Sequence, residues 1–376
     1  MLKKRKKKMM SRQQRKVIIS GGGTGGHIFP AIAIANALKR RDETTEILFI
    51  GALGRMEMEK IPKAGYRIEG LPIAGIQRRI TWKNLVLPYK VIQSLKKARM
   101  IIKNFQPDAV VGVGGYASGP VLFAATMMKI PSLIQEQNSY AGITNKILGK
   151  RVKKICVAYD GMEKFFPAEK IVATGNPVRK DIVNLEMKRD EARNFFGLSE
   201  ERKVLLILGG SLGAGTINES IRMNLEKLVG EGIQIIWQTG KGYYEKNAEA
   251  AKQFSERIKV YQFIDRMDLA YTAADVVISR GGALSIAELC IAKKPCVLVP
   301  SPNVAEDHQT KNALALVTKN AALLVKDTEA KEKLVEATLS LMRNESLQQT
   351  LKTNIAVLAK PNADDEIANE VFKLMN

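Results

Sequence analysis

The chain has 376 residues, of which 45% are hydrophobic and 26% are charged, with 59 Lys and Arg against 38 Asp and Glu. These values exclude a disordered or collagen-like chain and allow one large domain or two of ordinary size. The three cysteines form no Cys-x-x-Cys pair and have no metal-ligand spacing to either of the two histidines. The composition therefore indicates a reducing compartment and excludes a disulfide-stapled fold and a zinc site.

The first residues are strongly basic. Nine Lys and Arg and no acid fall within residues 1–16, which is less than half of the net charge of +21. Residues 1–15 are not expected to be a signal peptide, because they lack an apolar segment and a cleavage site. Since they also offer no apolar face to bury, we expect a solvated, disordered leader. Nucleic acid or an anionic membrane surface would neutralise this leader, and a purely solubilising role remains open.

Short apolar segments rich in Val and Ile alternate with amphipathic segments along the whole chain. The predicted strands are residues 16–20, 46–51, 109–113, 132–136, 154–158, 204–209, 234–240, 276–279 and 296–300. Such uncharged strands, separated by helical patterns, are typical of parallel sheets that are covered on both faces. The uncharged stretch 109–128 is interrupted by four glycines and a proline, so it predicts a strand, a turn and a helix rather than a membrane span.

The order of these elements repeats. A strand, a glycine turn and a helix occur at residues 17–26 (GGGTGG) and again at residues 204–215 (GGSLGAG). Later in each half, Asp108–Gly115 and Asp275–Gly282 share a second strand and glycine turn. We therefore predict two Rossmann-like units in tandem, joined near residues 175–178, with the ligand in the cleft between them at the carboxyl ends of the strands.

The first glycine turn matches G-x-G-x-x-G at Gly21, Gly23 and Gly26. A dinucleotide site also needs an acid at the end of the second strand, and that strand ends in Ile50-Gly51-Ala52. The pattern thus disfavours a redox dinucleotide, although the loop can still serve a phosphate or a sugar. No Asp-x-Asp motif occurs, so we expect no metal on a diphosphate and no cofactor.

Two side chains near the glycine turns are candidates for chemistry. His27 directly follows the first turn and could accept a hydroxyl proton near neutral pH, or it could simply bond to backbone at a helix start. Glu288 lies one helical turn beyond Leu284, after the turn at Gly281 and Gly282, and could accept from both hydroxyls of a ribose. The alternative for Glu288 is a surface glutamate that the helix dipole favours.

Residues 75–88 mix apolar and basic side chains, including Trp82 beside Arg78, Arg79 and Lys83. This composition suits an interfacial patch on anionic lipid, and ordinary core residues among solvated charges are the alternative. The sequence contains no zinc finger, helix-turn-helix or aromatic-rich strand of a nucleic-acid module, so we expect no nucleic-acid partner.

The sequence resembles the MurG family of lipid II synthases from about Lys16 to its C-terminal helix. Eight ordered segments carry the resemblance: GGGTGGHIFPAIAIA, VVGVGGYASGP, LIQEQNSYAGITNKIL, ATGNPVR, LLILGGSLGA, FIDRM, SRGGALSIAEL and DHQTKNA. The resemblance implies a GT-B fold, with an N-terminal acceptor- and membrane-facing domain at 16–177, a C-terminal UDP-GlcNAc-binding domain at 178–359, and a last helix at about 360–376 that returns to the first domain. It implies a hexosyltransferase of peptidoglycan and cell-wall synthesis, peripheral on the cytoplasmic face of the bacterial plasma membrane. The implied reaction is an inverting transfer of GlcNAc from UDP-GlcNAc to the 4-hydroxyl of the MurNAc of lipid I.

Site residues follow from the same segments. We expect His27 to act as the base, with Glu136 in reserve. The resemblance implies these donor contacts: Thr24, Gly25, Gly26, Asn138, Arg179, Ser211, Ile264, Ala283, Leu284, Ser285, Ile286, Ala287, Glu288 and Gln309, with Asn312 assisting. Two positions depart from the family pattern: Leu212 replaces an amide, and Gly281 stands where Ser or Ala is common. Another GT-B enzyme that uses UDP-GlcNAc, such as a 2-epimerase or a glycolipid glycosyltransferase, and a basic nucleic-acid-binding protein are the alternatives.

Overall fold

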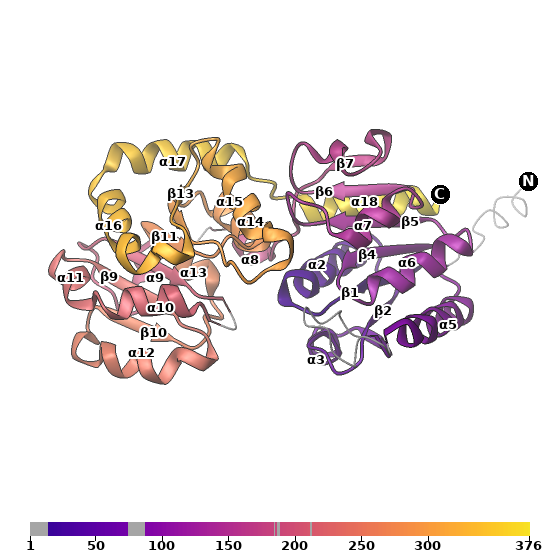
Figure 1. The fold of residues 1–376 in the computed structure, drawn as a ribbon, viewed down its shortest axis with the longest axis horizontal. Coiled ribbons are helices and arrows are strands. Elements are labelled where there is room, and N and C mark those ends of the chain that lie inside the picture. Colours follow the sequence, from indigo (N-terminus) through magenta and orange to yellow (C-terminus); the bar gives the residue numbers. More distant parts are fainter. Residues whose placement is uncertain (1–13, 74–86, 184, 186–188, 211–212) are drawn as a thin grey trace, which may run out of the picture. The chain divides into compact units, whose positions relative to one another are not determined.

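The protein folds into two compact units, each with its own parallel sheet and core (Figure 1). The structure is a computed structural model that describes residues 14–73, 87–183, 185, 189–210 and 213–376. The first unit contains the chain up to Glu136, together with Ala141–Thr174 and Asn362–Asn376. The second contains Gly175–Pro361 and a four-residue segment, Gln137–Tyr140.

The first unit is built on a seven-stranded sheet in the order β3-β2-β1-β4-β5-β6-β7. Its strands are β1 (Lys16–Gly21), β2 (Glu46–Ala52), β3 (Arg67–Leu71), β4 (Ala109–Gly114), β5 (Ser132–Glu136), β6 (Lys154–Val157) and β7 (Ile171–Ala173), and all neighbours pair in parallel. Such an order reverses direction at β1 and β4, where the carboxyl ends of doubly wound sheets bind ligands.

Helices cover both faces of this sheet. They are α2 (Gly25–Arg41), α3 (Glu57–Lys63), α5 (Leu87–Phe105), α6 (Ser118–Met127), α7 (Ile143–Gly149) and the C-terminal α18 (Ala363–Met375). Helix α18 packs against α2, burying Ile367, Ala368 and Val371 in the same core as β1. Arg40 of α2 fastens the start of α18 through ion pairs to Asp364 (2.6 Å) and Asp365 (2.9 Å).

The second unit has a six-stranded parallel sheet in the order β10-β9-β8-β11-β12-β13. Its strands are β8 (Val204–Leu208), β9 (Gln234–Gln238), β10 (Ile258–Tyr261), β11 (Val276–Ser279), β12 (Cys296–Leu298) and β13 (Leu323–Leu324). Its helices are α8 (Lys180–Val183), α9 (Arg189–Phe195), α10 (Gly215–Arg222), α11 (Leu225–Gly230), α12 (Tyr244–Ala251), α13 (Met267–Ala273), α14 (Ala283–Ala292), α15 (His308–Val317), α16 (Ala330–Arg343) and α17 (Glu345–Val357).

The structure explains the repeated aspartate of the two halves. Asp108, just before β4, accepts the backbone N–H of Lys16 at the start of β1 (2.7 Å). Asp275, just before β11, accepts the N–H of Val204 at the start of β8 in the same way (2.8 Å). Each carboxylate therefore locks the register of the two central strands whose far ends carry the glycine turns.

The prediction of two Rossmann-like parallel-sheet units is confirmed, and every predicted strand is present within a few residues of its expected bounds. Four short strands were not predicted: β3, β7, β10 and β13. Along the described part of the chain, no helix combines the length and apolar character that crossing a membrane requires. Most of the predicted basic leader and of the interfacial patch at 75–88 lies outside the described residues.

Candidate functional site

The first glycine loop leaves β1 at the switch point of its sheet and leads directly into α2. Thr24 is the exposed residue before the helix, and Gly25 and Gly26 form its first turn. Gly22 donates its N–H to the carbonyl oxygen of Gly114 at the end of β4 (3.3 Å), which ties the loop to the neighbouring strand. The N–H groups at the start of α2 are those that a helix leaves without intrahelical partners.

His27 lies in this first turn of α2 and is partly exposed. Its ring occupies the space beside Gly114, where a Cβ would stand 2.8 Å from the imidazole. Gly114 also has a φ of +94°, which glycine adopts without strain. The second glycine turn of the unit therefore makes room for the imidazole at the carboxyl end of β4.

Glu136, the last residue of β5, is only 2% exposed. Its Oε2 accepts hydrogen bonds from the N–H of Gly142 (3.1 Å) and from Nδ2 of Asn145 (2.8 Å). These bonds hold the start of α7. The geometry favours a role in positioning for this carboxylate, and the reserve assignment as a base stays a prediction.

The segment Gln137–Tyr140 packs within the second unit. Asn312 of α15, which is fully buried, donates from Nδ2 to Oδ1 of Asn138 (3.1 Å) and accepts from the N–H (2.8 Å) and the hydroxyl (3.0 Å) of Ser139. Asn176 donates to the carbonyl oxygen of Gln137 (3.0 Å). Asn138 is thus held beside α15, the helix that carries Gln309.

The carboxylate of Glu288 lies in the second turn of α14, which begins directly after Gly281 and Gly282. Its Oε2 accepts a hydrogen bond from the hydroxyl of the fully buried Tyr271 on α13 (3.0 Å). Burial raises the pKa of Glu288 to about 7, against the opposing effects of the Tyr271 hydrogen bond and the Arg179 charge. A carboxylate that is desolvated and aimed by a neighbour in this way is typical of a binding site.

Arg179 lies just before α8. Its guanidinium pairs with Asp181 and donates to the carbonyl oxygen of Asp265 (3.0 Å). The hydrogen bond to Asp181 raises the pKa of Arg179, with Glu288 adding a smaller effect in the same direction. Arg179 thus remains a cation near the start of α14, where a diphosphate would be stabilised by both groups.

The remaining predicted contacts lie around the same strand ends. The N–H of Ile264 donates to Oε1 of Gln238 (2.9 Å). The carbonyl oxygen of Ile264 is therefore the backbone group that we predict to contact uracil. Gln309 accepts the N–H of Ser301 (2.9 Å). Gly281 packs against the carbonyl of Gln309, because an added Cβ would lie 2.5 Å from that oxygen.

The first turns of α14 are formed, as expected, by Ala283, Leu284, Ser285, Ile286 and Ala287. The first N–H groups of a helix have no partner within the helix. Ser211 and Leu212 lie outside the described residues. Sequence reasoning missed Tyr271 and Gln238, since neither belongs to a glycine turn.

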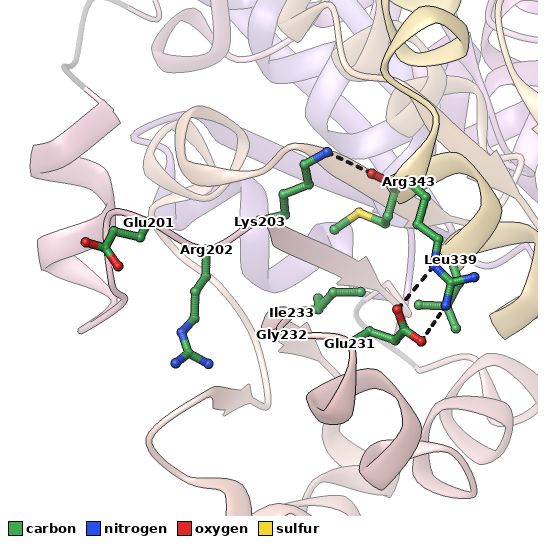
Figure 2. A pocket seen from close by; sticks show the side chains of 9 residues that line it. Glu201, Arg202, Lys203, Glu231, Gly232, Ile233, Leu339 and Arg343 are labelled. Atoms are coloured by element: carbon green, nitrogen blue, oxygen red, sulfur yellow. Dashed lines mark hydrogen bonds and ion pairs between the residues drawn. The ribbon is translucent and has the colours of Figure 1, made fainter.

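A hollow in the second unit lies at the opposite, amino-terminal end of β8 and β9 (Figure 2). Three of its charged lining residues have partners: Arg343 binds Glu231, and Lys203 donates to the carbonyl oxygen of Met342 (2.9 Å). Among the described residues, no group of three or more His, Cys, Asp or Glu side chains is placed to hold a metal ion.

Comparisons with known proteins agree with this arrangement. The chain matches the glycosyltransferase family 28 N-terminal domain at residues 17–157 and the C-terminal domain of the same family at residues 204–367. A relative from Cytophaga hutchinsonii, described as a UDP-N-acetylglucosamine–N-acetylmuramyl-(pentapeptide) pyrophosphoryl-undecaprenol N-acetylglucosamine transferase, is 59% identical over 94% of this chain and 95% of its own length.

Solved structures of related enzymes share the fold of this chain. MurG of Acinetobacter baumannii superposes with a TM-score of 0.77 at 29% identity, over 96% of this chain and 99% of that one. A UDP-GlcNAc 2-epimerase of Neisseria meningitidis (TM-score 0.66, 15% identity, 95% of this chain and 100% of that one) shares the fold alone. With its two doubly wound units and its glycine turns at both switch points, the chain belongs to the MurG family of GT-B glycosyltransferases, within glycosyltransferase family 28.

Proposed function

We propose that this protein transfers GlcNAc from UDP-GlcNAc to the 4-hydroxyl of the MurNAc of lipid I, with inversion, and so forms lipid II. The observation that carries the proposal is family membership at 59% identity, together with the partly exposed but desolvated carboxylate of Glu288 near the start of α14, which Tyr271 orients. The relative's name gives the same donor sugar and the same lipid-linked acceptor.

The second unit supplies the donor site. Ionised Glu288 accepts from the two ribose hydroxyls, and Tyr271 fixes the orientation of the carboxylate. The N–H groups at the start of α14 and the guanidinium of Arg179 face the diphosphate, with Ser211 as a further ligand. Gln309, with Asn138 held by Asn312, binds the GlcNAc ring, and Ile264 offers its carbonyl to uracil.

The first unit supplies the acceptor side. In the proposed step, the acceptor oxygen attacks the anomeric carbon from the face opposite UDP, the bond to the diphosphate oxygen breaks, and the α-linked sugar becomes a β-glycoside. His27 takes the hydroxyl proton, since its ring is partly exposed beside the glycine loop, whereas Glu136 is buried and already accepts two hydrogen bonds. Arg179 and the start of α14 stabilise the charge that develops on the leaving diphosphate.

A lipid-linked acceptor requires contact with a membrane surface, and we place the protein on the cytoplasmic face of the plasma membrane. Part of the support comes from α5, whose outward face carries exposed apolar and basic side chains at helical spacing: Tyr89, Ile92, Lys96, Arg99, Met100 and Lys103. This composition suits anionic lipid, with the basic leader adding attraction.

The proposal is tested by incubating the purified chain with UDP-GlcNAc and lipid I in vesicles that contain anionic lipid. We expect UDP and lipid II to form in equal amounts. Conversion of UDP-GlcNAc to UDP-ManNAc without lipid I would instead favour a 2-epimerase, and salt-sensitive DNA binding without sugar transfer would favour a nucleic-acid-binding protein.

A further inference from the structure

The first glycine loop encloses a carboxylate that the proposed reaction does not use. Glu57, the first residue of α3, is only 1% exposed, although Glu59 two residues later is a surface side chain paired with Lys63. A glutamate is almost never buried to this extent unless its oxygens have partners.

Both oxygens of Glu57 accept backbone hydrogen bonds at the switch point. Oε2 accepts the N–H of Gly23 in the first glycine loop (2.8 Å), and Oε1 accepts the N–H of Ala52 at the end of β2 (3.0 Å). In dinucleotide-binding folds, the second glycine of G-x-G-x-x-G lets the backbone approach a pyrophosphate. In this chain the N–H of that glycine is bound by an anion from within the protein.

The surrounding glycines leave space for this carboxylate. A Cβ on Gly22 would stand 2.2 Å from Oε1 of Glu57, and a Cβ on Gly51 would stand 2.6 Å from its Cγ. For Gly22, the three nearest atoms to such a Cβ all belong to Glu57, and its φ lies outside the left-handed region. Gly22 is therefore required by the carboxylate rather than by the backbone conformation.

The opposite side of the loop is fixed as well. Gly115 packs so closely that a Cβ would lie 2.2 Å from the carbonyl oxygen of Gly22, and Gly114 contacts the ring of His27. The loop is thus held between Glu57 on the β2 side and the glycine turn on the β4 side. Thr24, Gly25, Gly26 and His27 follow Gly23 directly in the chain, so a displacement of the Gly23 backbone also displaces these residues.

We propose that Glu57 is the positioning residue of the first glycine loop: its buried carboxylate holds Gly23 and Ala52 and so sets the geometry of Thr24 to His27 for sugar transfer. This inference rests on the proposed transferase function. Glu57 does not contact substrate, and it acts through the loop backbone.

The first test is Glu57→Gln, which keeps the size but turns one oxygen into an N–H₂ donor that faces a backbone N–H. We expect turnover to fall about tenfold to a hundredfold, because one buried hydrogen bond is lost. The affinity for UDP, measured by calorimetry, should stay within about twofold of wild type, since the nucleotide residues lie in the second unit. Glu59→Gln on the same helix is the matched control, and it should keep full turnover.

The second test is a double-mutant cycle. Gly22→Ala in the wild-type chain should reduce turnover about as much as Glu57→Gln, because its Cβ displaces the carboxylate. In a Glu57→Ala background the obstruction is gone, so adding Gly22→Ala should change turnover less than about twofold. Independent effects that multiply in the double variant would contradict the proposal.

Amide hydrogen exchange provides a readout that does not depend on catalysis. Gly23 and Ala52 should both exchange slowly in the wild type, and the one that faces the new N–H₂ group should exchange at least about tenfold faster in Glu57→Gln. Two results for Glu57→Gln would overturn the positioning role. One is a turnover above half of the wild-type value. The other is a loss of turnover accompanied by a similar fold-loss of UDP affinity and by a lower melting temperature. A wild-type chain that makes no lipid II refutes the transferase function itself, and the two failures are therefore distinguishable.

Discussion

Glu288→Gln should weaken donor binding and at the same time stabilise the second unit at alkaline pH. In the wild type, burial raises the pKa of Glu288 from 4.5 to about 7. The folded state therefore binds the proton more tightly than the unfolded state does, and stability is lost as pH rises from about 4.5 to about 7. Above that range the ionised carboxylate acts against folding.

The magnitude follows from the size of the shift. A rise from 4.5 to about 7 corresponds to about 3 kcal/mol, at about 1.4 kcal/mol per unit. Because Glu288 is partly exposed, solvent screening reduces this value. We expect a gain for Glu288→Gln of about 1–3 kcal/mol at pH 8 and about a quarter of that gain at pH 5, because the carboxyl of the unfolded chain begins to ionise at about 4.5. Glutamine can still accept the hydrogen bond from Tyr271, so that contact is kept.

The assay is urea unfolding at both pH values in a Trp82→Phe background. The chain has two tryptophans, so Trp237, which is buried in the second unit, then reports on that unit alone. UDP affinity should fall by about tenfold or more in Glu288→Gln, since a carboxylate that accepts two hydroxyls is replaced by a single neutral acceptor. Wild-type affinity should fall as pH drops below about 7.

Two results would refute this reasoning. A variant that is less stable than wild type at pH 8, or equally stabilised at pH 5 and pH 8, would show that Glu288 is not a desolvated carboxylate. Unchanged UDP affinity would show that it does not hold the ribose. Glu345→Gln, on an exposed side chain of the same unit, is the control for both measurements.

Three further predictions concern separate parts of the site. His27→Ala should lower turnover by about 10²–10⁴-fold with UDP affinity unchanged, and near-normal turnover would remove His27 as the base. Gly281→Ser should raise the KM for UDP-GlcNAc at least severalfold, because its Cβ would stand 2.5 Å from the carbonyl oxygen of Gln309; an unchanged KM would show that the loop shifts freely. Asn312→Ala should destabilise the second unit by about 1–3 kcal/mol in urea unfolding, since it leaves the Ser139 N–H without its buried acceptor. The same substitution should raise the KM for UDP-GlcNAc. A loss of stability without a change in this KM would show that Asn138 does not take part in sugar binding.

The central strands were predictable because they are uncharged and rich in Val and Ile, with a glycine turn at the end of several of them. Two of the missed strands lacked this signal, because β3 contains Arg67 and Glu69 and β10 contains Lys259. The other two, β7 and β13, are apolar but have only three and two residues. Their pairing depends on the neighbouring strand, which a local pattern cannot reveal.

The candidate site shows the same division. The position of Glu288 on a helix just after a glycine turn was predictable from the spacing, whereas its role in binding stays a prediction. Its partner Tyr271 lies 17 residues earlier on another helix, where no motif marks it. Glu57 is similar: on a seven-residue helix that contains Pro62, it reads as a surface acid beside Glu59, and only the fold brings its carboxylate to Gly23 and Ala52.

The most direct test of the central claim is the product formed from UDP-GlcNAc and lipid I by the purified chain. The account predicts one UDP released per lipid II formed, with the new GlcNAc in β-linkage to the 4-hydroxyl of MurNAc. No transfer to lipid I, or a product with retained α-linkage, would contradict it.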